Sequence, residues 1–224
     1  MRKFFSDSNP IIRGLAKLAD LMWLNFLYIL ISIPIFTIGA ATAALYSVTM
    51  KVVADEESYI TKDFFKAFKN NFKQATMLWI ICGLLLSLFG YTIYVLMTSG
   101  LSYAHVAMGI MGIPIILIAF TLLYAFPIMS KFENTMLNTA MNSLLISLAK
   151  FPMTVLMLVF SAIPILLVLN SIKWVPLLIL CGFSLVAYVN GSFMNRFFDK
   201  IIKTNEQEEQ EGEKSPEAEE KEPE

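Results

Sequence analysis

Four lysines form the first group of side chains that could bind a ligand. They recur at helical spacing within residues 61–74 and are Lys62, Lys66, Lys69 and Lys73. Four phenylalanines fall largely on the opposite side of the same segment, which predicts a helix lying in the membrane interface with its rings in the acyl boundary. Each lysine near an anionic surface contributes about 1 kcal/mol of attraction. The row is therefore a candidate anionic-lipid contact; the alternative is a set of positive anchors without lipid specificity.

A repeated amide forms the second group. Within residues 131–150, asparagine recurs every four positions on an otherwise apolar helix, at Asn134, Asn138 and Asn142. Such a polar stripe predicts either a face that docks on a partner or a solvated face. We take it as a candidate docking stripe.

Catalytic chemistry is not indicated by the sequence. His105 is the only histidine and has no carboxylate near it in sequence, and no zinc-protease, nucleophile-elbow or phosphate-loop motif is present. Cys82 and Cys181 each lie in an apolar run without CxxC spacing, as packing residues do. We expect no enzyme, no catalytic residue, no cofactor, no metal and no nucleic-acid partner.

The segments that position these side chains belong to a membrane protein. Residues 74–130 form a run of 57 residues without a charged side chain, and 57% of the whole chain is hydrophobic. One crossing of about 30 Å of hydrocarbon takes about 20 residues, so this run holds two crossings. No charged side chain lies inside the predicted spans, which argues against a proton-driven transporter.

Five hydrophobic segments predict an all-α polytopic bundle. The apolar blocks are residues 21–50, 74–130 (two spans), 151–172 and 174–195. None shows the period-two alternation of a β-barrel strand. Lysine and arginine gather in segments 51–73 and 131–150 and beyond residue 195, which places those segments and the C-terminus in the cytoplasm.

The first block is expected to be broken. The basic N-terminus also fits the cytoplasm, so residues 21–50 should cross an even number of times, although thirty residues are too few for two full helices. Pro34 and Gly39 interrupt the block at its middle. We predict four full spans plus a broken or re-entrant segment, with residues 21–33 descending and 40–50 returning. One tilted span with an outside N-terminus is the alternative.

Charge divides the chain into two regions. Residues 206–224 contain ten glutamates, whereas fifteen basic and eight acidic residues precede them. This predicts a membrane-embedded helical domain over 1–205 and a disordered acidic cytoplasmic tail over 206–224.

Several short stretches match a known pattern. They are 32–41 (SIPIFTIGAA), 44–46 (ALY), 64–69 (FFKAFK), 71–76 (NFKQAT), 126–127 (FP), 132–135 (FENT) and 148–152 (LAKFP). On these residues the chain resembles the YesL-like family of bacterial integral membrane proteins of unknown function, over roughly residues 1–200. The resemblance implies a bacterial plasma (inner) membrane location and no established catalytic or ligand residues.

The resemblance also suggests a role. Members of that family are often encoded beside carbohydrate-uptake systems, which implies an accessory or regulatory component of an ABC-type importer, with membrane lipids and importer subunits as partners. Pro34, Thr37 and Gly39 lie where the charges place a helix break, and they are a candidate helix break or functional element. The alternatives are an independent small-solute transporter or channel, its path lined by this break, and a lipid-binding, membrane-organising protein. Neither the ligand nor the oligomeric state follows from the sequence.

Overall fold

The computed structural model describes residues 10–99, 103–132 and 134–214 of the chain. Across these ranges the backbone is helical apart from short turns and contains no strand, which confirms the all-α prediction. The longer helices are α1 (Pro10–Ser32), α2 (Ile38–Val53), α3 (Ile60–Thr98), α4 (Ala104–Lys131), α5 (Met136–Ala149), α6 (Phe151–Asn170) and α8 (Phe183–Lys214). The short elements are η2 (Ile35–Thr37), η3 (Ile172–Trp174), α7 (Val175–Leu177) and the π-helical η4 (Leu178–Gly182).

Six stretches within the described ranges are long and apolar enough to cross a membrane. They belong to α1, α2, α3, α4, α6 and the η3–α8 segment. The longest helix, α3, has 39 residues, and at about 1.5 Å per residue it exceeds the hydrocarbon thickness of about 30 Å. These helices fit the predicted multi-pass membrane protein.

The first hydrophobic block breaks where it was predicted to break, but its two arms are longer than expected. The α-helix stops at Ser32 and resumes at Ile38. Because α1 begins at Pro10 and α2 runs to Val53, each arm includes residues outside the apolar block and reaches spanning length. The two arms are therefore not limited to the thirty residues of the apolar block, and the count of four full spans plus one re-entrant segment stays a prediction.

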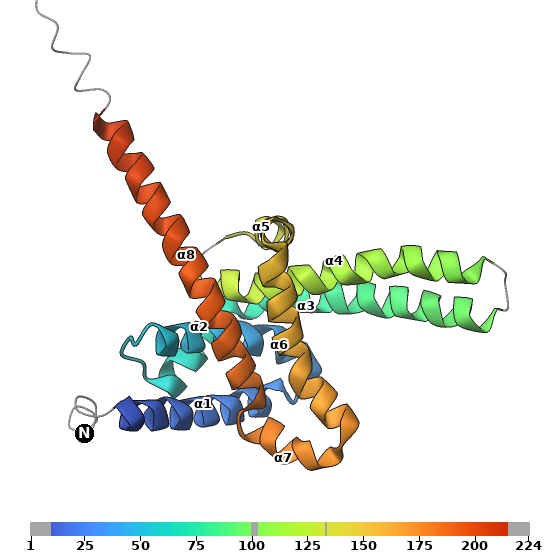
Figure 1. Cartoon of the computed structure of the whole chain (residues 1–224), viewed down its shortest axis with the longest axis horizontal. Helices are drawn as coiled ribbons and strands as arrows, with labels where there is room; N and C mark the ends of the chain where they lie inside the picture. The colour runs from blue at the N-terminus through green and yellow to red at the C-terminus, as the bar shows by residue number, and fades with distance from the viewer. Residues whose placement is uncertain (1–9, 100–102, 133, 215–224) are drawn as a thin grey trace, which may run out of the picture.

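Helices α1 and α2 form an antiparallel hairpin (Figure 1). The Tyr28 and Thr42 hydroxyls lie 3.4 Å apart near the closed end of the hairpin, and Lys17 Nζ lies 2.8 Å from Asp55 Oδ1 at its open end. This ion pair lowers the pKa of the Asp55 carboxyl, first through its hydrogen bond and then through the lysine charge. The start of α1 and the end of α2 are therefore on the same side.

Helix α2 is the buried centre of the bundle and contacts α1, α3, α4 and α8. One face consists of small side chains without exposed surface: Ala40, Ala41, Ala43 and Ala44. A Cβ atom added at Gly39 would lie only 2.4 Å from the carbonyl oxygen of Ala75 on α3. Small residues thus allow close backbone approach, which is how membrane helices commonly pack.

The α3–α4 hairpin, in contrast, extends away from this centre (Figure 1). Its outer part exposes large apolar side chains, among them Leu84, Leu88, Tyr91, Tyr94, Val106, Ile110 and Ile113. In a membrane such a surface faces the acyl chains, where exposed apolar groups cost nothing.

An asparagine joins α1 to the irregular start of the last span. Asn25 is fully buried, and its Nδ2 donates to the carbonyl oxygens of Leu178 (3.2 Å) and Ile179 (2.6 Å). Its Oδ1 accepts from the Ser184 backbone N–H at 3.0 Å. The π-helical turn between these positions departs from the regular helical bonding pattern, and Asn25 provides partners for its backbone groups.

The basic ends of several helices gather at one end of the bundle. Asn195 on α8 donates to the Met50 carbonyl oxygen at 3.0 Å and accepts from Lys131 Nζ at 3.5 Å. Lys150 Nζ lies 5.8 Å from the ring centre of Phe197. We refer to this region as the basic end.

The predicted acidic tail begins inside α8. Residues 206–214 continue that helix, whereas 215–224 lie outside the described residues. The division of the chain at residue 205 stays a prediction.

Candidate functional site

The predicted break element is a compact turn packed against α3. Thr37 Oγ1 donates to the carbonyl oxygens of Ile31 and Pro34, the latter at 2.6 Å, and closes the turn after Pro34. Trp79 Nε1 on α3 donates to the Ile35 carbonyl oxygen at 3.0 Å. Pro34, Thr37 and Gly39 therefore act together in bending the chain and fixing it to α3. A functional role beyond this bend stays a prediction.

The lysine row lies on the outside of α3, where all four side chains are exposed. The predicted interfacial helix is not a separate element, because residues 61–74 continue without interruption into the apolar part of α3. Its aromatic face also differs from the prediction: Phe64 is fully buried, while Phe65 and Phe72 remain partly exposed. The reason is that α2 covers this side of α3, so Phe64 packs into protein and not into lipid.

A polar cavity of about 550 Å³ opens at the basic end between α2, α3 and the α4–α5 connection. We call it the polar cavity. Its lining residues are Ser47, Lys51, Asp63, Lys66, Ala67, Asn70, Asn71, Gln74, Met129, Ser130, Lys131, Phe132, Asn134 and Thr135. It therefore unites one lysine of the predicted row with one asparagine of the predicted stripe, which sequence reasoning had treated as separate surfaces.

The carboxylate in the polar cavity already has several donors. Asp63 Oδ2 lies 3.3 Å from Lys51 Nζ and accepts from Ser58 Oγ (3.1 Å) and the Tyr59 backbone N–H (3.2 Å). Asp63 lies in the first turn of α3, where a negative charge stabilises the N-terminus of a helix, and its contacts hold the start of α3 in place. Two further lysines, Lys66 and Lys131, line the same cavity.

Polar contacts fix the wall of the cavity formed by the α4–α5 connection. Gln74 Nε2 donates to the Asn134 carbonyl oxygen at 2.8 Å and to Thr139 Oγ1 at 3.3 Å. The Thr135 hydroxyl accepts from the Asn138 backbone N–H at 3.4 Å and caps the first turn of α5. Glu133, between the lining residues 132 and 134, lies outside the described residues.

Helix α5 divides the predicted asparagine stripe. Asn138 and Asn142 are exposed on the helix, whereas Asn134 precedes it and lines the polar cavity. The buried face of α5 carries small hydroxyl side chains without exposed surface, which are Thr139, Ser143 and Ser147. Its outer face carries large apolar residues that are 49–68% exposed, which are Leu137, Met141, Leu145 and Leu148. The sequence pattern identified the amides of α5. It did not predict that small polar residues would form the buried face of this helix and large apolar residues its exposed face.

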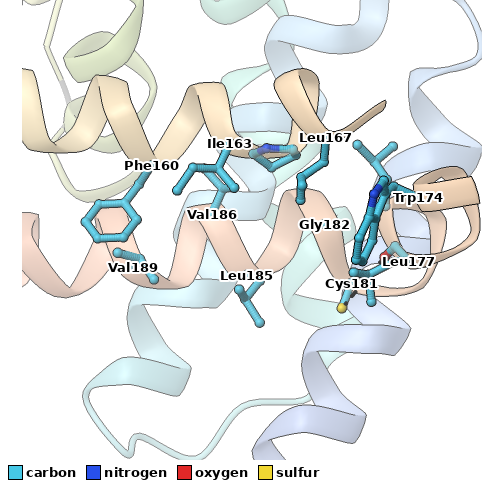
Figure 2. A pocket seen from close by; sticks show the side chains of 12 residues that line it. Phe160, Ile163, Leu167, Trp174, Leu177, Cys181, Gly182, Leu185, Val186 and Val189 are labelled. Atoms are coloured by element: carbon cyan, nitrogen blue, oxygen red, sulfur yellow. Dashed lines mark hydrogen bonds between the residues drawn. The ribbon is translucent and has the colours of Figure 1, made fainter. Parts of the chain in front are cut away.

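A second cavity lies between α6 and the α7–η4–α8 segment and has a volume of about 270 Å³ (Figure 2). Figure 2 shows Phe160 near one end and Trp174 near the other, with Ile163, Leu167 and Leu185 between them. Its lining is almost wholly apolar, so it can accept a hydrocarbon group but offers little to orient a polar one.

Among the described residues, no group of three or more histidine, cysteine, aspartate or glutamate side chains is arranged to hold a metal ion. His105 is exposed near the outer tip of the α3–α4 hairpin. Neither cavity is lined by Pro34, Thr37 or Gly39.

Comparison with known proteins gives one match. A family model described as a protein of unknown function, DUF624, matches residues 21–95. That region contains the break element, all of α2 and the lysine row, and it ends before α4 and α5. No curated protein and no solved structure is significantly similar to the chain.

Proposed function

We propose that this chain is a non-enzymatic accessory subunit of an ABC-type carbohydrate importer in the bacterial plasma membrane. It binds the importer's membrane-spanning subunits through the outer face of α5. The matched family and the apolar helices support an integral membrane protein of unknown activity, and the importer role is the more specific proposal. The link to carbohydrate uptake comes from the resemblance of the sequence to the YesL-like family.

The observation that carries the proposal is the outer face of α5. Four large apolar side chains and the amides of Asn138 and Asn142 share the exposed part of this helix, although its other face is tied to the bundle by small hydroxyl residues. Apolar groups alone would suit lipid, but amides at the membrane boundary gain more from a partner with matching donors and acceptors. A subunit that is itself a membrane protein meets both requirements.

The position of this face also suits an importer. Helix α5 follows α4 at the basic end, beside Lys131, and the gathering of lysines there supports a cytoplasmic location for this end and for both termini. The cytoplasmic side is where the ATP-hydrolysing subunits of such importers meet their membrane subunits. A regulator docked there can influence their coupling without chemistry of its own.

The test is purification of the tagged full chain from its native membranes in mild detergent, followed by mass spectrometry. We expect stoichiometric recovery of a carbohydrate importer's membrane and ATPase subunits. Asn138→Ala with Asn142→Ala, and separately Leu137→Ala with Met141→Ala, should reduce that recovery at least fivefold. The matched control is Leu84→Ala with Leu88→Ala on the outer part of α3, which should leave it unchanged.

Two results would contradict this proposal. Recovery of the chain without importer subunits would remove the importer role, and equal recovery with the α5 variants would remove α5 as the docking surface. Solute flux through liposomes containing only this chain would instead favour the independent transporter.

Membrane organisation is the second candidate function, and the exposure of all four lysines on α3 favours it. It predicts that reversing the charge of Lys62, Lys66, Lys69 and Lys73 together lowers the amount of anionic lipid that co-purifies. Unchanged lipid content after this fourfold reversal would count against it.

A further inference from the structure

The cavity between α6 and the α7–η4–α8 segment, which we call the apolar cavity, lies in the half of these helices away from the basic end. We propose that it holds one acyl chain of an anionic phospholipid, whose headgroup lies at Lys173 and Trp174. The apolar cavity shares no residue with the outer face of α5 or with the lysine row of α3. The site is therefore independent of both functions proposed above.

The position of the apolar cavity along its helices matches one leaflet of a membrane. Lys150 at the start of α6 and Asn195 on α8 both belong to the basic end. Helix α6 has 20 residues, so at about 1.5 Å per residue it spans the hydrocarbon thickness of about 30 Å. The connection that includes Trp174 therefore lies at the opposite membrane surface. From there the lining reaches back to Phe160 in the middle of α6, which is about the depth of one acyl chain.

Contacts between α6 and α8 close the inner end of the apolar cavity. Asn190 Nδ2 donates to the Ser161 hydroxyl at 2.9 Å, and the ring centres of Phe160 and Phe193 lie 6.3 Å apart. Figure 2 shows the lining side chains between the two helices from Phe160 toward Trp174. The cavity thus ends near the middle of the membrane, where the acyl chains of one leaflet also end.

Both walls of the apolar cavity depart from a regular α-helix. Pro164 on α6 lacks a backbone N–H, and the π-helical turn η4 supplies Leu178 and Gly182 to the other wall. A Cβ atom added at Gly182 would lie 3.1 Å from Leu178 Cγ, so the turn itself is tightly packed. Asn25 on α1 holds η4 through two of its carbonyl oxygens. π-Helical turns are frequent at functional sites, and this one shapes the wall of a cavity.

The lining of the apolar cavity selects hydrocarbon. Its side chains are almost wholly apolar, so a water molecule there would find few hydrogen-bond partners. Both walls belong to segments of spanning length, so the medium outside is the acyl region of the membrane. Sites for whole small molecules have volumes of about 300–1,000 Å³. A volume of about 270 Å³ therefore suits one chain and not a whole lipid.

Two neighbouring residues at the end of the apolar cavity define the headgroup. Trp174 lines the cavity and is exposed, and a tryptophan at the membrane surface places its indole at the level of the headgroups. Lys173 is also exposed and is the only charged residue between positions 151 and 195 of the sequence. A lysine at this level attracts a negative headgroup, so an anionic phospholipid should bind more tightly than a zwitterionic one.

The experiment counts lipids on the full chain by native mass spectrometry in mild detergent. The chain is titrated separately with phosphatidylglycerol and with phosphatidylcholine that has the same acyl chains. We expect saturable binding, at least threefold tighter for phosphatidylglycerol. In a second measurement, the chain retains phosphatidylglycerol with a photoreactive diazirine in its acyl chain and is then irradiated. The adducts should map to residues 160–167 and 178–189.

Matched variants locate the site. Ile163→Trp places a larger side chain in the apolar cavity and should lower the affinity for phosphatidylglycerol at least fivefold. Ile165→Trp is the control, because Ile165 is exposed on the same helix but lies outside the lining, and it should change the affinity less than twofold. Lys173→Gln should abolish the preference for phosphatidylglycerol but not the binding of lipid. All three side chains are exposed, and unchanged thermal unfolding will verify that each variant folds.

Three results would overturn the proposal. Adducts outside the lining, or equal effects of Ile163→Trp and Ile165→Trp, would indicate ordinary lipid on the outside of α6. Equal binding of the two lipids by the original chain would remove the anionic headgroup. A dimer in the native mass spectrum that is lost with Ile163→Trp would assign the apolar cavity to a second copy of the chain and not to a lipid.

Discussion

The two N-terminal hairpins, α1–α2 and α3–α4, are both apolar enough to cross a membrane but differ in how deeply the protein buries them. The stretch containing α2 has a mean hydropathy of 1.4, and 67% of its most apolar window is buried in the protein. The corresponding values for α4 are 2.5 and 6%. The less hydropathic helix is thus at the centre of the bundle and the more hydropathic one at its surface.

This order is expected when lipid is the solvent. Lipid tails are as apolar as leucine, so a large apolar side chain gains little by moving from lipid into protein. Close backbone approach and interhelical hydrogen bonds decide which helix becomes central, and α2 has the alanines and Gly39 that permit such approach. Three substitutions test this contrast.

The largest effect is expected at Gly39. Gly39→Leu must displace the backbone of α3 at Ala75, and it should destabilise the protein by about 3 kcal/mol or more. The measurement is the unfolding midpoint in detergent micelles. Gly83→Leu is the matched control, because no atom lies within 4 Å of a Cβ added there, and it should not destabilise the fold. Equal losses from both variants would refute the special role of close α2–α3 packing.

A smaller loss of stability is expected from the substitution Asn25→Leu. This substitution keeps a side chain of similar size but removes the partners of the Leu178 and Ile179 carbonyl oxygens and of the Ser184 N–H. We expect a destabilisation of about 2 kcal/mol, because these groups are left unsatisfied inside the bundle.

Thr92→Val is the control for Asn25→Leu. The Thr92 hydroxyl donates only to the Leu88 carbonyl oxygen of its own helix, at 2.9 Å, and its loss should cost less than about 0.5 kcal/mol. Similar losses from the two variants would mean that interhelical hydrogen bonds matter no more than bonds within a helix.

Much of the fold follows from the local sequence. Charge-free runs long enough to span the hydrocarbon layer predict the helices, and Pro34 predicts the break between α1 and α2. Both signals can be read from the sequence because each depends only on neighbouring residues. The length of α1 was not predictable in this way, since its first turns include Arg13 and Lys17, which a hydrophobicity criterion excludes.

The candidate site was predicted less well. Lys66 and Asn134 were each selected from periodic patterns, but their convergence on one cavity depends on how α3 meets the α4–α5 connection. The spacing of residues along the chain does not predict this contact between α3 and the α4–α5 connection. Similarly, the buried face of α5 consists of Thr139, Ser143 and Ser147. A prediction that buries the large apolar side chains of this helix would place these three residues on its exposed face.

The smallest of the three effects concerns the open end of the α1–α2 hairpin. Asp55 has a φ of 56°, and the Glu56 N–H donates to the Lys51 carbonyl oxygen at 3.0 Å, as in a Schellman termination of a helix. Asparagine tolerates this backbone conformation, so Asp55→Asn removes the charge but not the turn. Because the pair with Lys17 is exposed, the expected loss at pH 7 is below about 1 kcal/mol.

The pH dependence distinguishes this pair from a backbone effect. Lys17 lowers the pKa of Asp55 in the folded protein, so the pair stabilises the fold above the ordinary carboxyl pKa of about 4 and loses that contribution as the pH falls through the lowered value. The difference in unfolding midpoint between the original chain and Asp55→Asn should therefore disappear in acid and shrink in high salt, and Lys17→Gln should reproduce it. A difference that persists at low pH would instead assign the effect to the helix-ending turn, and the hairpin would then be held at its open end by backbone geometry and not by charge.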